Sequence, residues 1–350
     1  MNPKKRGKGA FGDVYEDGNM AIKKLKKPEF LVQELIAMKY LRESKYVVSC
    51  RGYDLTKLEL RMDLYDMSLK DMMDKYDLSN EQKRSIFSDI LCGVSSIHSL
   101  SLIHCDLKHS NILVTQVPLK AVICDLGISS VNKYARFFQT PKGYRRPDQL
   151  LGPHLGESHD LYSLSVLGIE MFGNIRLETQ MYPERLMEVA QETVNDPDIR
   201  SILVEFSKTE SDLYPSARSA LNKVFNTDYV LAPPVINLSP MRITTDDNKY
   251  IHDTVKTLTS RMNINKGRKG YYIMTERLNN PSYPVVDRNQ YTLYISSIFL
   301  LLSAMFNNSE FNYNSIIDIN GGMWKALDID RVLTDIINKD ELMNILMIPN

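Results

Sequence analysis

Residues 102–113 read Leu-Ile-His-Cys-Asp-Leu-Lys-His-Ser-Asn-Ile-Leu, with a polar cluster between two short apolar runs. Three of these polar side chains suit the transfer of a phosphoryl group. Asp106 offers a carboxylate that can accept the proton of an attacking hydroxyl, and Lys108 can neutralise charge on the phosphoryl group. The amide oxygen of Asn111 is a ligand of the kind that magnesium prefers. The stretch is therefore compatible with metal-assisted phosphoryl transfer.

A second polar site follows the next apolar run, in the sequence Cys124-Asp125-Leu126-Gly127. Asp125 adds a carboxylate that, together with Asn111, completes the oxygen ligands expected for magnesium. Any one of these residues alone is more simply explained by a structural role. The complete set of residues, in this order along the chain, favours a catalytic role over a structural one.

A glycine-rich stretch lies near the amino terminus and fits G-x-G-x-x-G-x-V. It leads into a predicted hairpin with its turn at Glu16 to Asn19, whereas a dinucleotide-binding turn leads into a helix. Glycines allow backbone amides to lie over phosphates without obstruction by side chains. The residues expected to bind the nucleotide here are Gly7, Lys8, Gly9, Ala10, Phe11, Gly12 and Val14.

Lys23 follows an apolar run that is predicted to be the third strand, after the hairpin. In this register its ammonium points to where the glycine loop would place the α- and β-phosphates. Apolar residues at helical spacing predict a helix over residues 30–41, with Pro28 just ahead of it. Glu34 lies in the middle of that helix and can pair with Lys23. For each residue taken alone, a solvated side chain is the alternative.

These motifs resemble those of eukaryotic-type protein kinases over residues 1–226. Residues 104–111 are similar to H-R-D-L-x-x-x-N, and residues 125–127 to D-F-G. The resemblance implies an α+β, bilobal protein-kinase fold, with a small antiparallel-sheet lobe over residues 1–63 and a helical lobe over residues 64–226. It also implies ATP and Mg²⁺ as cofactors.

The resemblance further implies a protein kinase that phosphorylates Ser or Thr of protein substrates, because D-L-K is the serine/threonine spelling of the catalytic loop. The residues implied to be catalytic are Asp106, Lys108, Lys23 and Glu34, and those implied to bind the metal are Asn111 and Asp125. The residues implied to bind the nucleotide, beyond those of the glycine loop, are Ala21, Lys23, Met62, Asp63 and Tyr65.

Features of the cyclin-dependent and dual-specificity groups are present as well. Residues 28–34 stand where cyclin-dependent kinases carry P-S-T-A-I-R-E, and H-C-D-L-K is a dual-specificity spelling. Arg145 is an arginine that the same larger group carries, and it indicates proline-directed specificity.

The sequence also departs from the family pattern. Cys105 replaces the arginine that gathers an activation-loop phosphate, and Leu126 replaces the phenylalanine of D-F-G. Asp148 and Tyr214 stand where a Glu and an Arg form a buried ion pair, which Arg218 is a candidate to rebuild. A pseudokinase that binds nucleotide or other proteins without catalysis is therefore the alternative.

The chain of 350 residues is long enough for about two domains. Its 43 Lys and Arg residues balance 43 Asp and Glu residues, which removes the general electrostatic argument for a nucleic-acid or anionic-membrane partner. The basic start lacks the apolar core of a secretory signal, and the most apolar stretch, residues 294–306, is too short to span a bilayer. We therefore expect no membrane and no nucleic-acid partner.

Cysteine usage and a basic cluster bear on the compartment. The four cysteines include no C-x-x-C pair, so neither a disulfide framework nor a zinc site is expected. Reduced thiols are typical of an intracellular protein, whether cytoplasmic or nuclear. A solvated surface and a nuclear-import signal are both open interpretations of the basic cluster Lys4, Lys5, Arg6 and Lys8.

A change of composition marks off the end of the chain. Residues 227–240 hold three prolines without regular periodicity and predict a linker. Helical spacing of apolar residues predicts an all-helical domain over residues 241–350, whose apolar stretch at 294–306 resembles the buried helix of a cyclin box. The resemblance implies an intramolecular regulatory domain that acts in cis on the helix carrying Glu34. A helical extension that only covers the kinase lobe is the alternative.

Overall fold

The computed structural model describes most of the first 231 residues of the chain and little of the remainder. The predicted all-helical, cyclin-like region lies almost entirely outside the described residues, as does most of the predicted linker. The residues described are 4–9, 11–100, 102–131, 142–147, 156–208, 216–229, 231, 296–297, 329 and 332–333.

A five-stranded antiparallel sheet forms the small lobe, in the order β1-β2-β3-β5-β4. The predicted hairpin is confirmed, because β2 pairs with β3 around a tight turn in which Gly18 adopts a φ of 60°. Such a left-handed conformation favours glycine. The strands are β1 (Lys4–Lys8), β2 (Gly12–Asp17), β3 (Met20–Leu25), β4 (Cys50–Asp54) and β5 (Glu59–Asp63).

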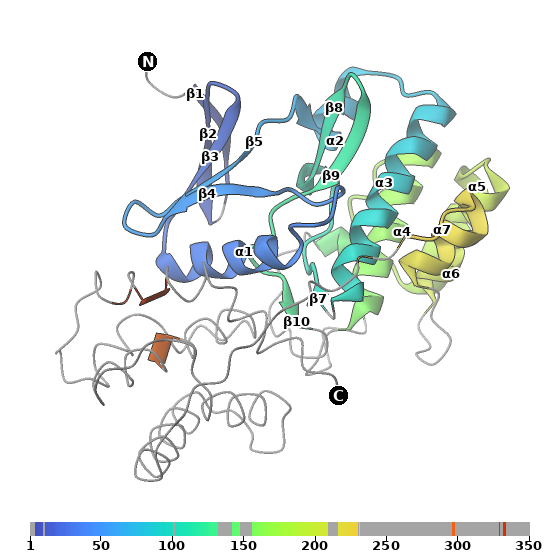
Figure 1. Cartoon of the computed structure of the whole chain (residues 1–350). Coiled ribbons are helices and arrows are strands. Elements are labelled where there is room, and N and C mark those ends of the chain that lie inside the picture. The colour runs from blue at the N-terminus through green and yellow to red at the C-terminus, as the bar shows by residue number, and fades with distance from the viewer. Residues whose placement is uncertain are drawn as a thin grey trace, which may run out of the picture.

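Helix α1 (Pro28–Tyr40) lies beside this sheet, as Figure 1 shows, and confirms the predicted helix. It begins at Pro28, where the missing backbone N–H of proline costs no helical hydrogen bond. Strand β4 was not expected from the sequence. It is an edge strand with Gly52 in its middle and a register irregularity, so it lacks an alternating apolar pattern.

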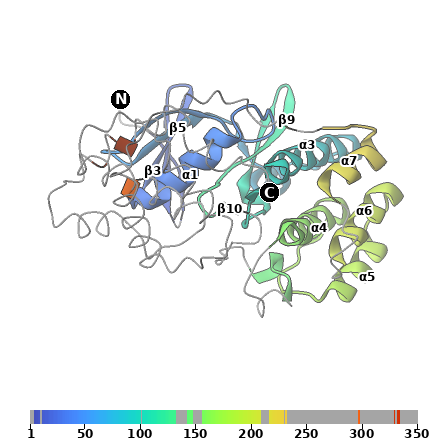
Figure 2. The same cartoon turned by 60° about the horizontal axis from the view of Figure 1, so that its bottom comes forward.

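The large lobe is mainly helical. Figures 1 and 2 show helices α3, α4, α6 and α7 grouped together, away from the five-stranded sheet. None of the helices in the described part of the chain has both the length and the apolar character that crossing a membrane requires. The helices are α2 (Leu69–Lys75), α3 (Asn80–Ser99), α4 (Glu157–Gly173), α5 (Pro183–Thr193), α6 (Pro197–Ser207) and α7 (Ala217–Phe225).

The long helix α3 begins with a capping box at Ser79. The Ser79 hydroxyl accepts a hydrogen bond from the backbone amide of Gln82, and the Gln82 side chain accepts one from the backbone amide of Ser79. This reciprocal pair satisfies two of the amides that a helix start leaves without partners. The start of α3 is therefore fixed locally.

Short strands place the polar loops of the large lobe. Strands β8 and β9 form a hairpin in which Ile112 lies opposite Ile123, so the residues just outside the pair, Asn111 and Cys124, are brought together. These strands and turns are β6 (Met67–Ser68), β7 (Leu102–Ile103), β8 (Ile112–Gln116), β9 (Leu119–Ile123), β10 (Ser130–Val131) and the 3₁₀ turns η1 (His109–Asn111) and η2 (Lys142–Tyr144).

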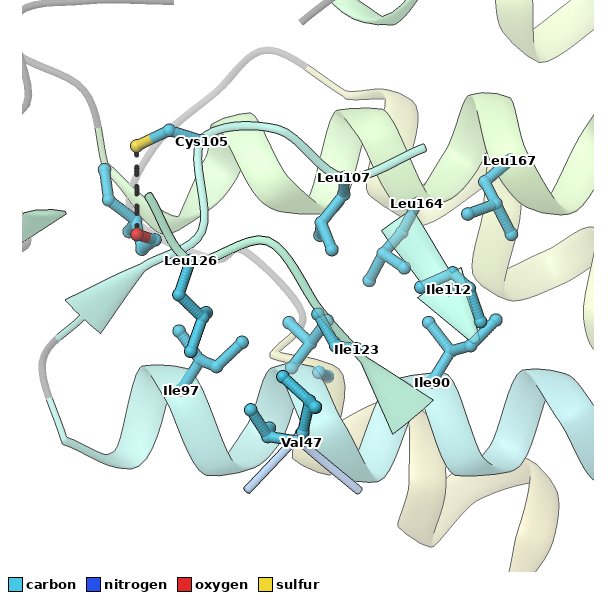
Figure 3. Close-up of a cluster of buried hydrophobic side chains, with 14 of the residues drawn as sticks. Val47, Ile90, Ile97, Cys105, Leu107, Ile112, Ile123, Leu126, Leu164 and Leu167 are labelled. Atoms are coloured by element: carbon cyan, nitrogen blue, oxygen red, sulfur yellow. Dashed lines mark hydrogen bonds between the residues drawn. The ribbon is translucent and has the colours of Figure 1, made fainter. Parts of the chain in front are cut away.

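An apolar core lies beneath these loops. Figure 3 shows side chains of α3, α4 and the β8–β9 hairpin converging there, and Leu126 reaches into the same cluster. Complete burial of each such side chain contributes about 1.5–3 kcal/mol to stability. The labelled members with no exposed surface are Ile90, Ile97, Cys105, Leu107, Ile112, Ile123, Leu126, Leu164 and Leu167.

Candidate active site

Three charged side chains from three elements meet between the sheet and the polar loops. The Lys23 ammonium on β3 donates to both oxygens of Glu34 on α1, at 2.8 and 2.6 Å, and to Oδ1 of Asp125 at 2.7 Å. Lys23 and Glu34 are buried, with side-chain exposures of 9% and 1%. The structure therefore brings together three residues that the sequence singled out separately.

Burial and charge act in opposite directions on the pKa values of this cluster. Burial alone lowers the pKa of Lys23, but the charges of Glu34 and Asp125 outweigh it and raise that pKa above its ordinary value. Burial raises the pKa of Glu34. For Asp125, the Lys23 ammonium outweighs burial and lowers the pKa of the carboxyl. Lys23 and Asp125 therefore form an ion pair at neutral pH.

Asp106 lies in the loop between β7 and η1 and is 3% exposed. Its Oδ2 accepts from the Lys108 ammonium at 2.6 Å and from the Asn111 amide at 2.8 Å. Its Oδ1 is buried and has no partner among the described residues. Burial raises the pKa of Asp106, and Lys108 offsets this shift only in part. An unsatisfied buried carboxylate oxygen of this kind can accept a hydroxyl proton.

The loop around Asp106 is held by two residues to which the sequence assigned no role. Both oxygens of the fully buried Asp160, on α4, accept from loop amides: Oδ2 from His104 at 2.7 Å and Oδ1 from Cys105 at 3.0 Å. His104 Nδ1 accepts from the Asp106 amide, which leaves Nε2–H to donate to the Cys124 carbonyl at 3.0 Å. A usable signal was the presence of a carboxylate within the apolar run of α4.

The candidate metal ligands Asn111 and Asp125 lie on adjacent loops. The Cys124 amide donates to the Asn111 carbonyl at 2.9 Å, and Asp125 follows in the left-handed conformation, with a φ of 64°. A non-glycine residue in this region is uncommon and is often found at functional sites. The Asn111 amide nitrogen donates twice to Asp106, to its backbone oxygen and to its Oδ2, so Oδ1 of Asn111 is the atom left to bind a cation.

This donor set fits magnesium. Among the described residues no group of three or more His, Cys, Asp or Glu side chains forms a metal cage. Magnesium is usually held by one or two carboxylates together with substrate phosphates and water rather than by an all-protein cage. The carboxylate of Asp125 and the amide oxygen of Asn111 would form the protein part of such a site.

The glycine loop packs closely on its neighbours. A Cβ on Gly12 would lie 2.4 Å from the Lys24 carbonyl oxygen, so only glycine fits there without a shift. The Gly9 amide donates to the Gly12 carbonyl at 2.8 Å and closes the turn. Phe11 points inward and meets the ring of Phe30 edge-on at 4.8 Å, which ties the loop to α1. Ala10 lies outside the described residues.

The comparisons with known proteins decide the family. A family model described as "Protein kinase domain" matches residues 2–230. The chain belongs to this protein kinase family. The match ends at residue 230, before the predicted carboxyl-terminal domain.

Curated relatives of this kinase domain carry kinase names. "Stress-activated protein kinase JNK" of Suberites domuncula is 27% identical over 219 residues, covering 55% of this chain and 60% of the relative. "Serine/threonine-protein kinase shk1/pak1" of Schizosaccharomyces pombe is 27% identical over 264 residues, which cover 68% of this chain and 39% of the relative. "Putative serine/threonine-protein kinase L670" of Acanthamoeba polyphaga mimivirus is 32% identical over 136 residues, which cover 36% of this chain and 25% of the relative. The chain spans about half the length of the curated relatives it matches.

The connection between the two lobes of the kinase domain contains the expected adenine-binding residues. Met62 is buried and pairs with Ala21 across β3 and β5. The carboxylate of Asp63 accepts two hydrogen bonds from Arg51, at 2.8 and 2.7 Å, so its side chain is already engaged. Tyr65 is half-buried, and burial, together with the charge of Asp63, raises its pKa to about 12.

Residues that bear on the departures from the kinase pattern lie partly within the described ranges. Cys105 is fully buried and its thiol donates to the Ile103 carbonyl at 3.8 Å, which Figure 3 marks. Arg218, the suggested replacement cation, instead forms a two-bonded ion pair with Asp228 at 2.6 and 2.9 Å. Asp148 and Tyr214, the positions of the altered ion pair, lie outside the described residues.

Proposed function

We propose that this protein kinase domain transfers the γ-phosphate of ATP to Ser or Thr hydroxyls of protein substrates. The observation that carries this proposal is the unpartnered Oδ1 of the buried Asp106 beside the ion cluster of Lys23, Glu34 and Asp125. A proton acceptor and a phosphate-binding cation thus lie in one region of the protein. Relatives named as serine/threonine kinases support the choice of acceptor.

Each proposed catalytic side chain has a task that its contacts allow. Asp106 accepts the proton of the acceptor hydroxyl through Oδ1. Lys108, already 2.6 Å from Asp106, neutralises charge on the phosphoryl group in transfer. Lys23 holds the α- and β-phosphates and is kept in place by Glu34.

The nucleotide is proposed to lie beneath the glycine loop. Backbone amides of the loop would contact its phosphates, and backbone groups of the connection between the lobes would contact adenine. Magnesium, bound through Asn111 and Asp125, supplies charge neutralisation on the phosphates. The remaining proposed nucleotide contacts are Gly7, Lys8, Gly9, Ala10, Phe11, Gly12, Val14, Ala21, Met62, Asp63 and Tyr65.

Substitution of the proposed base tests catalysis directly. The Asp106→Asn variant should transfer radiolabelled γ-phosphate to a generic basic acceptor protein about 10²–10⁴ times more slowly than the wild type, the usual contribution of general-base catalysis. The Asp17→Asn variant is the matched control and should keep wild-type activity, because Asp17 is exposed at the end of β2. If no Asp106-dependent label transfer is found at any ATP concentration, the kinase proposal is wrong and the pseudokinase alternative is supported.

Nucleotide binding is tested separately from transfer. Addition of Mg²⁺ and ATP should raise the melting temperature of the wild-type protein, because a ligand that binds only the folded state stabilises it. The Lys23→Met variant should lose that shift. If neither protein responds to Mg²⁺ and ATP, then the nucleotide-binding part of the proposal is wrong.

We also propose that the carboxyl-terminal part of the chain, joined through a linker at residues 227–240, activates the kinase domain in cis. Every residue of α1 from Leu31 to Met38 is buried, whereas a helix that packed only on the sheet would leave one face exposed. Ile329, Val332 and Leu333 are buried at helical spacing, and their short stretch, in red, lies beside the amino-terminal end of α1 in both views (Figures 1 and 2). This packing would hold Glu34 against Lys23.

The cis proposal predicts that damage far along the chain lowers kinase activity. Leu333→Asp in the full chain should reduce the rate of phosphate transfer at least about tenfold, since an unpaired charge at a buried apolar position is strongly unfavourable. The same change at the exposed Tyr182, Tyr182→Asp, is the control. A Leu333→Asp variant or a chain ending at residue 234 that is as active as the full chain would contradict cis activation.

A further inference from the structure

A buried hydrogen-bonded cluster, formed by His109, Tyr144 and Glu170, joins three elements outside the residues assigned above. His109 opens the turn η1, Tyr144 ends the turn η2, and Glu170 lies near the end of α4. The Nδ1 atom of His109 lies 2.7 Å from the Tyr144 hydroxyl and 3.2 Å from Oε2 of Glu170. The Tyr144 hydroxyl donates to the same Glu170 oxygen.

The cluster has a defined direction of hydrogen bonding. Burial raises the pKa of Glu170, but hydrogen bonds from His109, Tyr144 and the Leu177 amide outweigh it and lower that pKa, so Glu170 is ionised. Burial, followed by the Glu170 charge, raises the pKa of Tyr144, so this hydroxyl stays protonated and donates. The proton on His109 Nδ1 is then shared between the Tyr144 oxygen, at 2.7 Å, and Oε2 of Glu170, at 3.2 Å. The residues at both ends of this hydrogen-bonded cluster are buried, with His109 3% and Glu170 4% exposed.

His109 stands between two residues of the proposed catalytic machinery. The Asn111 amide donates to the Lys108 carbonyl at 2.9 Å across the turn that His109 opens, and the Ile112 amide donates to the His109 carbonyl. A displacement of the His109 side chain would therefore shift Lys108, whose ammonium lies 2.6 Å from Oδ2 of Asp106.

Tyr144, at the end of the turn η2, connects the same cluster to α4. Its ring lies edge-on to that of His109, with 6.2 Å between the centroids, and its backbone carbonyl accepts from the Ser163 hydroxyl on α4 at 3.0 Å. Tyr144 is thus fixed both to α4 and to the catalytic turn. The turn that His109 opens follows directly on Lys108, so the cluster adjoins the side chain that contacts Asp106, the proposed acceptor of the hydroxyl proton.

We propose that His109 is a positioning residue that couples the catalytic turn to the turn η2, which ends at Tyr144, and so sets the affinity for the protein acceptor. The inference rests on the proposed protein kinase function. A cluster that only stabilised the fold would change the melting temperature and the fraction of active protein, but it would leave the KM of the active molecules unchanged.

The test measures KM and kcat of the full-length chain with myelin basic protein as acceptor. His109→Ala and Tyr144→Phe should each raise the KM for the acceptor about tenfold, while the KM for ATP changes less than about twofold. Combining the two should raise the acceptor KM no further, because both remove the same contact. His109→Asn, whose side-chain amide can still donate, should stay within about threefold of the wild type.

Matched controls separate this effect from general damage. Ser110→Ala changes an exposed side chain in the same turn, and Tyr182→Phe removes an exposed hydroxyl; both should keep the wild-type KM. An unchanged acceptor KM in His109→Ala, or independent effects of the two substitutions that multiply, would overturn the inference while leaving the kinase function intact. An inactive wild-type chain would overturn both.

Discussion

The buried His159 makes the stability of the kinase domain depend on pH in a calculable way. It lies in the first turn of α4, next to the Asp160 that holds the catalytic loop, and has no exposed surface. Burial lowers its pKa to about 4, with smaller contributions from the charges of Arg145 and Arg146, and these outweigh the opposing charge of Asp160. We predict that the neutral form of His159 is required in the folded state.

The sign and size of the effect follow from proton binding. An unfolded chain protonates this histidine near pH 6.5, but the folded chain does so only near pH 4, so the unfolded state binds more protons between these values. The contribution of His159 to the free energy of unfolding is therefore fully present above pH 6.5 and is lost as the pH falls toward 4. The loss is about 2 kcal/mol at pH 5 and about 3 kcal/mol at pH 4, from 1.36 kcal/mol per pKa unit.

Urea denaturation of the wild type and of His159→Gln between pH 7 and pH 4.5 measures this loss. The variant should be less stable at pH 7, because packing changes, but it should lose less stability on acidification. The lowered pKa values of Asp160 and Glu170 contribute only below their ordinary range, so they do not interfere in this window. A stability difference between the two proteins that is the same at pH 7 and pH 5 would refute the reasoning.

Three further predictions concern packing and the glycine loop. Gly168→Ala places a methyl group 2.4 Å from a Leu203 methyl, so it should cost about 1–3 kcal/mol in urea denaturation; no loss would mean that α6 can shift freely. Ser79→Ala removes the capping box of α3 and should cost about 1 kcal/mol, measured in the same way, whereas Ser79→Asp should restore most of it. Gly12→Ala meets the backbone of Lys24 at 2.4 Å and should weaken ATP binding in titration calorimetry, and an unchanged affinity would show that the loop does not contact the nucleotide.

The local parts of the fold could be predicted from the sequence because local physics specifies them. The hairpin of β2 and β3 has its own turn signal, and Ser79 caps α3 without help from distant residues. The proposed phosphate-transfer residues were singled out for a similar reason, since their order and chemistry fit one another along the chain. Strand β4 was missed because its edge position needs little apolar patterning.

The supports of the candidate site could not be read from local patterns. Asp160 and Glu170 bind loops that lie far away in the sequence, and Glu170 acts through His109 and Tyr144 from two other elements. Helical spacing explained the apolar side chains of α4 without requiring either carboxylate. A buried carboxylate needs hydrogen-bond donors. Asp160 and Glu170, among the apolar residues of α4, therefore indicated distant partners without identifying them.

The β8–β9 hairpin has a consequence for how much the chain length here can vary. Pairing of Ile112 with Ile123 sets the distance between Asn111 and Cys124, whereas the exposed tip at Val117 takes no part in it. Extra residues at the tip would lengthen the chain between the two loops without separating them in space. A single residue inserted within the paired part would instead shift the register and turn the inward-facing side chains outward. We therefore expect the hairpin to tolerate insertions at its tip but not among its paired residues, because only the paired residues fix the positions of Asn111 and Cys124.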